Sequence, residues 1–133
     1  MLMIVGVAAV EIHVHGSGSL KAKRGVVRSI SQRLRNRFNV SVSEVGGQGR
    51  WQAAVLGIAA VGSDAVVLRR VLERAVAFTE DLHLAEVMHA DFELIRLPYE
   101  EELADGEGGI VGDGEGGIAG DGEGGIADGE PEG

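Results

Sequence analysis

The basic residues between positions 12 and 43 are the side chains of this sequence best suited to a chemical task. Seven lysines and arginines lie there without a single carboxylate, although the whole chain carries a net charge of −9 at pH 7. A cluster of one sign raises the local electrostatic potential and attracts polyanions, most often nucleic acid. The cluster therefore predicts binding of a phosphate-rich partner. Its members are Lys21, Lys23, Arg24, Arg28, Arg33, Arg35 and Arg37.

These basic residues fall on a segment whose pattern predicts an amphipathic helix over residues 20–38. Apolar side chains recur every three or four residues at Val27, Ile30, Leu34 and Phe38, and Ser19 can cap the first turn. At about 100° per residue, the principal basic positions share a stripe about 80° wide. An ordinary solvated helix face is the alternative, but such a face usually mixes both signs of charge. The stripe consists of Lys21, Arg24, Arg28, Gln32 and Arg35, with Arg33 and Arg37 on its flank.

A second candidate contact lies in the loop at residues 48–51. Arg50 can add a phosphate contact to the basic helix, and Gln48, Gly49 and Trp51 complete a loop that could meet a partner. For Trp51, which is the sole tryptophan, a packing anchor is the interpretation we favour. We therefore add Arg50 alone to the predicted nucleic-acid-binding residues.

Catalysis and metal binding find little support in the residue pattern. The chain has no cysteine, which excludes thiolate nucleophiles, disulfides and cysteine-based zinc sites. His13 and His15 alternate on one strand face with Glu11 and could meet a metal, but histidines beside a turn are the simpler interpretation. No nucleophile adjoins a base, and no glycine-rich phosphate loop follows a strand. We expect no enzymatic activity, no catalytic residue, no metal site and no cofactor.

The elements that would position these residues follow the order βαββαβ. Strands are predicted at residues 3–14, 39–45, 51–61 and 87–97, and a second helix begins at Ser63 or Asp64. Its apolar stripe is Leu68, Val71, Ala75, Phe78 and Leu82. This order predicts a ferredoxin-like α+β fold, a four-stranded antiparallel sheet with both helices on one face. The first and third strands are apolar on both faces, so we expect them at the centre of the sheet.

The sheet face without helices is also expected to be apolar. Val5, Val7 and Ala9 would line it together with their partners on the third strand. An uncovered apolar patch usually marks an interface, so a homodimer through this face or through a sheet edge is one interpretation. An ordinary mixed surface is the other.

The composition divides the chain into a domain at residues 1–97, a linker at 98–104 and a tail at 105–133. The tail repeats an eight-residue unit that begins DGEGGI, and its nine acids without a base leave twelve acids and twelve bases in residues 1–104. Such a composition predicts disorder. The tail either competes with RNA for the basic helix or is a passive solubilising segment. The apolar start of the chain reads as a strand, so we expect a cytoplasmic protein without a membrane segment.

Three stretches of the sequence resemble one known family. They are SLKAKR with VVRS at residues 19–24 and 26–29, RLRNRFNVSVSEVG at residues 33–46, and WQ at residues 51–52 followed by LGIA at 56–59. Over residues 1–97 the chain resembles the YlxP-like family, a small bacterial domain of unknown function. The resemblance implies a ferredoxin-like fold and a link to translation and ribosome maturation, and it implies no catalytic residue. Gly25, where a charged residue is usual, and the repetitive tail depart from the family pattern.

The sequence therefore predicts a non-enzymatic accessory protein that binds RNA or a ribosomal particle. Domains of the same element order that recognise RNA stack bases on aromatics of the first and third strands. Here the first strand has none and the third offers only Trp51 at its start, so we expect phosphate contacts to dominate. The alternative is a small-ligand-sensing or oligomerisation domain without nucleic-acid binding. It would hold an anionic ligand at the turn of residues 17–24 and dimerise through the open sheet face.

Overall fold

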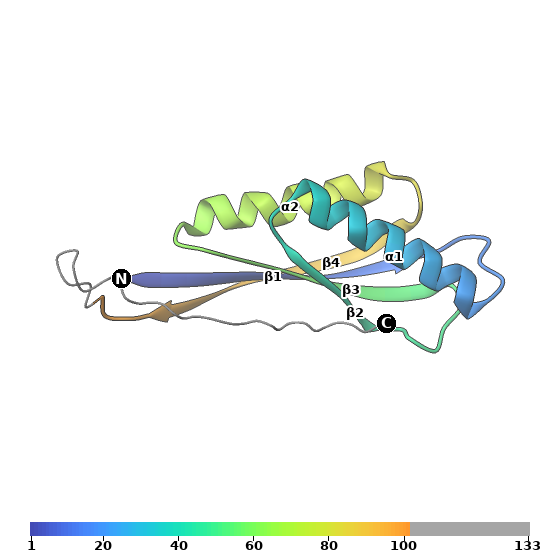
Figure 1. Ribbon diagram of the computed structural model, residues 1–133, viewed down its shortest axis with the longest axis horizontal. Helices are drawn as coiled ribbons and strands as arrows, with labels where there is room; N and C mark the ends of the chain where they lie inside the picture. Colours follow the sequence, from blue (N-terminus) through green and yellow to red (C-terminus); the bar gives the residue numbers. More distant parts are fainter. Residues whose placement is uncertain (102–133) are drawn as a thin grey trace. The chain divides into compact units, whose positions relative to one another are not determined.

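Six elements follow one another in the order that the sequence predicts. The computed structural model describes residues 1–101, so the predicted tail and residues 102–104 of the predicted linker lie outside the described residues. The pattern βαββαβ is confirmed (Figure 1). The elements are β1 (Leu2–His13), α1 (Leu20–Arg37), β2 (Ser41–Gly46), β3 (Ala53–Gly62), α2 (Ala65–Asp81) and β4 (Glu86–Pro98).

The four strands form one antiparallel sheet in the order β2-β3-β1-β4, with both helices on the same face (Figure 1). This is the ferredoxin-like α+β arrangement, and the central position of β1 and β3 is confirmed. Side chains of β1 alternate between the two faces, so that Ile4, Ala8 and Val10 are buried beneath the helices. Pairing of β1 with β4 extends to the chain start, where Tyr99 N–H donates to the Met1 carbonyl at 3.0 Å.

Polar side chains define where both helices begin. The Ser19 hydroxyl accepts a hydrogen bond from Ala22 N–H at 3.0 Å, as predicted. Of the two candidate caps for α2, Asp64 is the one used, because its carboxylate accepts from the backbone N–H groups of Val66 and Val67. Satisfying these otherwise unpaired N–H groups stabilises a helix start. Within residues 1–101, no helix has the length and apolar content needed to cross a membrane.

The apolar face of α2 differs in part from the predicted stripe. Leu68 and Ala75 are buried as expected, but the other fully buried positions are Leu72 and Thr79. The predicted Val71, Phe78 and Leu82 are partly buried, and Phe78 and Leu82 pack against the core, so the stripe was wrong in omitting Leu72 and Thr79. Thr79 was missed because it is polar. Its hydroxyl donates to the Ala75 carbonyl at 2.9 Å, which satisfies the group inside the core.

The opposite face of the sheet carries apolar side chains that no described element covers. Val61, Val5 and Ile95 form one row across β3, β1 and β4, because Val5 pairs with both of the others. Val61 is 62% exposed and Ile95 48%. We call this face, opposite α1 and α2, the open sheet face. Such a row of half-exposed aliphatic side chains agrees with the apolar residues on both faces of β1 and β3.

Candidate nucleic-acid interface

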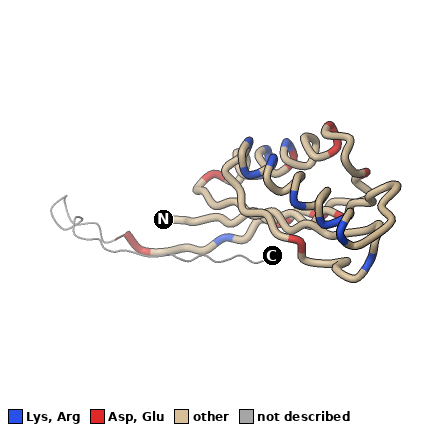
Figure 2. The backbone as a smooth tube through the Cα atoms, turned by 45° about the vertical axis from the view of Figure 1, so that its right-hand side comes forward, with Lys and Arg blue, Asp and Glu red and all other residues tan. Residues whose placement is uncertain are grey.

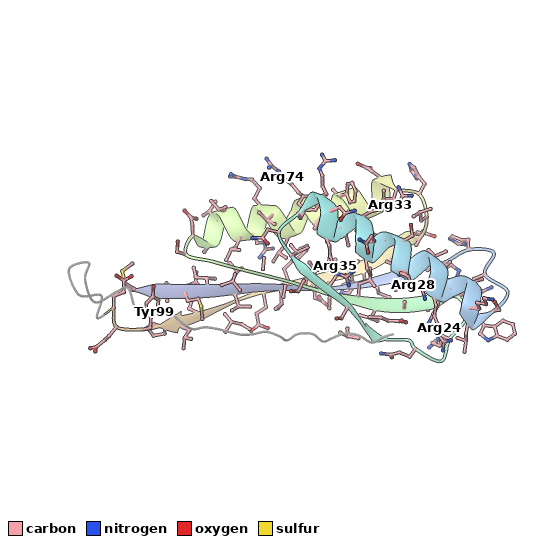
Figure 3. The ribbon with its side chains drawn as sticks, viewed as in Figure 1. Arg24, Arg28, Arg33, Arg35, Arg74 and Tyr99 are labelled. Atoms are coloured by element: carbon pink, nitrogen blue, oxygen red, sulfur yellow. The ribbon has the colours of Figure 1, made fainter. Side chains whose placement is uncertain are left out.

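Helix α1 presents six of its seven basic side chains to solvent. Val27, Ile30 and Leu34 face the core and leave the opposite side of the helix to polar residues. Arg24 lies at the beginning of α1 and Arg28 one turn later (Figure 3). Figure 2 shows the basic positions following one another along α1 without an acidic residue between them. The exposed basic side chains are those of Lys21, Arg24, Arg28, Arg33, Arg35 and Arg37.

None of these six side chains forms an ion pair with a carboxylate of residues 1–101. Helix α2 differs, because there Arg69 Nε pairs with Glu73 Oε2 at 3.2 Å. The positive charge of α1 is therefore not neutralised by its described neighbours. Such uncompensated charge sustains the local potential that attracts a polyanion.

Three of the arginines are oriented by contacts that leave donors free. Arg35 Nη2 donates to the Val42 carbonyl at 2.8 Å, and Arg33 Nε donates to Ser29 Oγ at 3.2 Å. The Arg37 guanidinium lies 5.4 Å from the centre of the Phe78 ring. A guanidinium has five N–H donors, so each of these side chains can still bind phosphate oxygens. Because these contacts already restrict the arginine side chains, fewer conformations are lost on binding, and the entropic cost of binding is smaller.

Lys23 does not belong to this surface, which corrects the predicted site. Its side chain is 0% exposed, and its ammonium donates to Glu44 Oε2 at 3.1 Å, to the Gly47 carbonyl at 2.7 Å and to the Ala53 carbonyl at 3.2 Å. These three bonds use all three ammonium donors. The physical reason is its position four residues before Val27, on the core-facing side of α1. That spacing, and not the residue type, was the signal in the sequence.

The contacts of Lys23 also place the loop between β2 and β3 beside the first turn of α1 (Figure 1). Gly47 adopts φ 78°, and a side chain there would lie 2.9 Å from the Ala53 carbonyl oxygen, so only glycine fits. Arg50 N–H closes a turn on the Gly47 carbonyl at 3.0 Å. The exposed Arg50 therefore lies on a loop held at the same end of the fold as Arg24.

Trp51 is exposed on this loop and is not the packing anchor that we favoured from sequence. Its side chain is 57% exposed, and the strand that follows starts only at Ala53. The main chain beside it is nonetheless fixed, because Val14 N–H donates to the Gln52 carbonyl at 2.9 Å. We call Lys21, Arg24, Arg28, Arg50 and Trp51 the α1–loop surface.

The histidine pair has different surroundings from those expected. The rings of His13 and His15 are neighbours, with centroids 4.3 Å apart. The carboxylate beside them belongs to Glu86 of β4 and not to Glu11, since His15 Nε2 lies 2.7 Å from Glu86 Oε1. No group of three or more potential metal ligands occurs in the part of the chain that the structure describes. His15 therefore pairs with Glu86 two residues beyond the end of β1.

Comparisons with known proteins agree with the predicted family. The model of a family described as "Protein of unknown function (DUF503)" matches residues 5–92. The uncharacterized protein YlxP of Bacillus subtilis (strain 168) is 44% identical over 77 residues, which cover 58% of this chain and 84% of that protein. Among solved structures, the de novo designed protein Foldit4 matches with a TM-score of 0.41 and 12% identity, over 74% of this chain and 99% of that chain. The family model spans most of the domain, and the Bacillus subtilis protein is similar over most of its own length. The chain therefore belongs to the DUF503 family of YlxP-like proteins, whose function is unknown.

Proposed function

We propose that this protein is a non-enzymatic accessory factor of the cytoplasm that binds RNA, free or within a ribosomal particle, through α1 and the β2–β3 loop. The observation that carries the proposal is the exposed positive charge of α1, which no carboxylate of residues 1–101 neutralises. With Lys23 removed from the set, the proposed contacts are Lys21, Arg24, Arg28, Arg33, Arg35, Arg37 and Arg50.

The distribution of charge favours the helical face over the open sheet face. In the described residues of β1 and β3, the open sheet face carries Val5, Val7, Ala59 and Val61 and neither a lysine nor an arginine, and its one aromatic ring is that of His13 at the end of β1. Stacking of bases on the sheet, as in RNA-recognition domains, would need aromatic rings on both strands. The partner is therefore expected on the side of α1, where cations can bind phosphate groups.

A link to the ribosome rests on the family resemblance and not on the geometry. Membership of the YlxP-like group implies a connection with translation and ribosome maturation. Phosphate contacts suit an RNA partner of any sequence, because they respond to the backbone and carry no sequence information. An accessory factor that docks on ribosomal RNA needs such contacts and no reaction of its own.

Charge reversal at α1 tests the proposal. Replacing Arg24 and Arg28 with glutamate should weaken binding of a fluorescein-labelled RNA more than tenfold at low salt, measured by fluorescence anisotropy. The matched control replaces Arg70 and Arg74 on α2 with glutamate, which changes the net charge by the same amount. With four to seven phosphate contacts, the logarithm of the wild-type affinity should fall with the logarithm of salt concentration at a slope of about −3 to −6.

Two results would contradict the proposal. Equal losses in the α1 and α2 variants would mean that net charge, and not the surface of α1, governs binding. Failure of the wild-type chain to bind any RNA at low salt would remove RNA as the partner. Thermal unfolding followed by circular dichroism verifies that both double variants are folded.

Self-association through the open sheet face is a second candidate function, and it is compatible with the first. The half-exposed row of Val61, Val5 and Ile95 favours it, since burial of aliphatic side chains away from water lowers the free energy. A second copy of the chain offers the same row, which can pair with itself about a twofold axis. The alternative of a small-ligand sensor has no comparable observation in its favour.

A further inference from the structure

The single tryptophan of the chain lies at the surface, although large aromatic side chains usually contribute to a core. Trp51 is 57% exposed, whereas Phe38 and Phe78 pack edge to face with ring centroids 5.6 Å apart. Exposing an indole loses the free energy that its burial would contribute. An exposed indole on a defined loop is therefore a candidate for contact with a partner.

The loop that carries Trp51 is held in place on both sides. Lys23 binds the Gly47 carbonyl before the loop and the Ala53 carbonyl after it, at 2.7 and 3.2 Å. Val14 N–H fixes the adjacent Gln52 carbonyl at 2.9 Å. Because Lys23 is fully buried and all its ammonium donors are used, it anchors the loop and does not act as a surface charge. The indole is thereby presented from a fixed main chain.

Two arginines lie at the same end of the fold as the indole. Arg50 precedes it in the loop, and Arg24 follows the anchoring Lys23 in α1. Figure 3 shows Arg24 at the end of α1 that lies beside this loop. No described carboxylate forms an ion pair with either arginine. An aromatic ring beside uncompensated arginines is the combination with which proteins bind single-stranded nucleic acid, because the ring stacks on a base and the cations bind the backbone.

We propose that Trp51 stacks on an unpaired base of the bound RNA, while Arg24 and Arg50 hold the flanking phosphates. The α1–loop surface then selects single-stranded RNA over an RNA duplex. In a duplex each base is already stacked between its neighbours, and the groove that displays base edges most fully is too deep and narrow for side chains. This inference rests on the proposed binding of RNA and adds the class of RNA that the surface takes.

The sole tryptophan makes the test direct, because all indole fluorescence comes from this position. The full chain is titrated at low salt with a mixed-sequence RNA of about 12 nucleotides that cannot pair with itself, and with the duplex of that strand and its complement. We expect the single strand to quench the fluorescence and to bind at least several-fold more tightly than the duplex. In anisotropy measurements with labelled RNA, Trp51→Leu should lose about tenfold in affinity for the single strand, and Trp51→Tyr should retain most of it.

The outcomes separate this inference from the proposed function. If the wild-type chain binds RNA but its fluorescence stays constant and Trp51→Leu binds equally well, stacking is refuted while RNA binding stands. Equal affinity for the single strand and the duplex likewise refutes the selection. If neither RNA binds, the proposed function itself fails. Quenching by the wild-type chain requires no substitution, so the test does not depend on the folding of a variant.

Discussion

The ammonium of Lys23 connects α1 to β2 and to both ends of the β2–β3 loop. It bonds a carboxylate of β2 and the two carbonyls at the ends of the β2–β3 loop, through Glu44, Gly47 and Ala53. Burial of a lone charge costs several kcal/mol, and only a complete set of partners offsets it. Lys23 therefore stabilises a local arrangement on which the positions of Arg50 and Trp51 depend.

Replacing Lys23 with methionine should lower the free energy of unfolding by about 3 kcal/mol, because Glu44 and two carbonyls would lose their donor. Urea denaturation measures the change. Lys21→Met is the matched control, since Lys21 is exposed in the same turn of α1, and it should stay within about 0.5 kcal/mol of the wild type. Equal stability of the two variants would show that the buried ion pair is not an anchor.

At the residue scale, the sequence predicted charge better than exposure. Six of the seven basic side chains of α1 are at the surface because the opposite face of that helix is apolar. Lys23 was misplaced because its type suggested solvent, while its partners come from residues 44, 47 and 53. Trp51 was misplaced because its type suggested burial, while its side chain is exposed. Side-chain type reports an average tendency, whereas exposure depends on which distant segment covers a position.

At the scale of elements, the start of α2 has two neighbouring candidates for the N-cap residue. Ser63 and Asp64 are both good N-cap residues by type. Only the Asp64 carboxylate reaches backbone N–H groups of the first turn, at 2.9 Å to Val66 and 3.1 Å to Val67. The boundary is therefore defined by which residue takes the extended conformation at the helix start.

Asp64→Ala should lower the stability by about 1 kcal/mol, because two N–H groups of α2 would lose their acceptor. For a domain of this size, the midpoint of thermal unfolding should fall by about 4–8 °C. Ser63→Ala is the control and should leave the midpoint within about 3 °C of the wild type, as an exposed substitution usually does. Circular dichroism records both transitions. A larger effect at Ser63 would contradict the assigned cap.

The order and type of the elements were predictable, whereas the face of α2 was only partly so. Strands β1 and β3 carry apolar residues on both faces, which favours the centre of a sheet, and this pattern does not depend on distant residues. The predicted stripe of α2 omitted Leu72 and Thr79, which are fully buried, whereas Val71 and Phe78 are only partly buried. Packing against β1 and β4 sets the rotation of the helix, and a single helix does not encode it.

At the scale of the whole domain, the two sides of the sheet differ in chemistry. The helical side carries the uncompensated arginines of α1, and the open sheet face carries aliphatic side chains such as Val5 and Val61. Binding of RNA on one side leaves the other free for a second copy. A dimer of this form would present two basic surfaces, which raises the effective concentration for the second contact with a long RNA.

Val61→Lys should disrupt self-association, because it introduces a charge into the aliphatic row of the open sheet face. Sedimentation velocity over a range of concentrations measures the effect, and we expect a wild-type dimer and a Val61→Lys monomer. Val66→Lys is the control, since Val66 is 65% exposed on α2, away from the sheet. A wild-type chain that stays monomeric at every concentration would refute the interface.

The acidic tail gives the chain a charge opposite to that of its proposed binding surface. Residues 105–133 hold nine acids and no base, so their deletion changes the net charge from −9 to zero. We expect the deletion to tighten RNA binding at low salt, because like charge on the protein repels phosphate. The gain should shrink as salt rises, since the Debye length falls to about 8 Å at 0.15 M.

A full-length variant with every tail acid replaced by its amide separates charge from chain length. If repulsion operates, this variant should bind RNA as tightly as the deleted chain, because both lack the same nine charges. Unchanged affinity in both variants would leave the tail a passive segment. If deletion alone tightened binding, the tail would obstruct the surface by its bulk. Anisotropy titrations at two salt concentrations distinguish these cases, since only repulsion between charges weakens with screening.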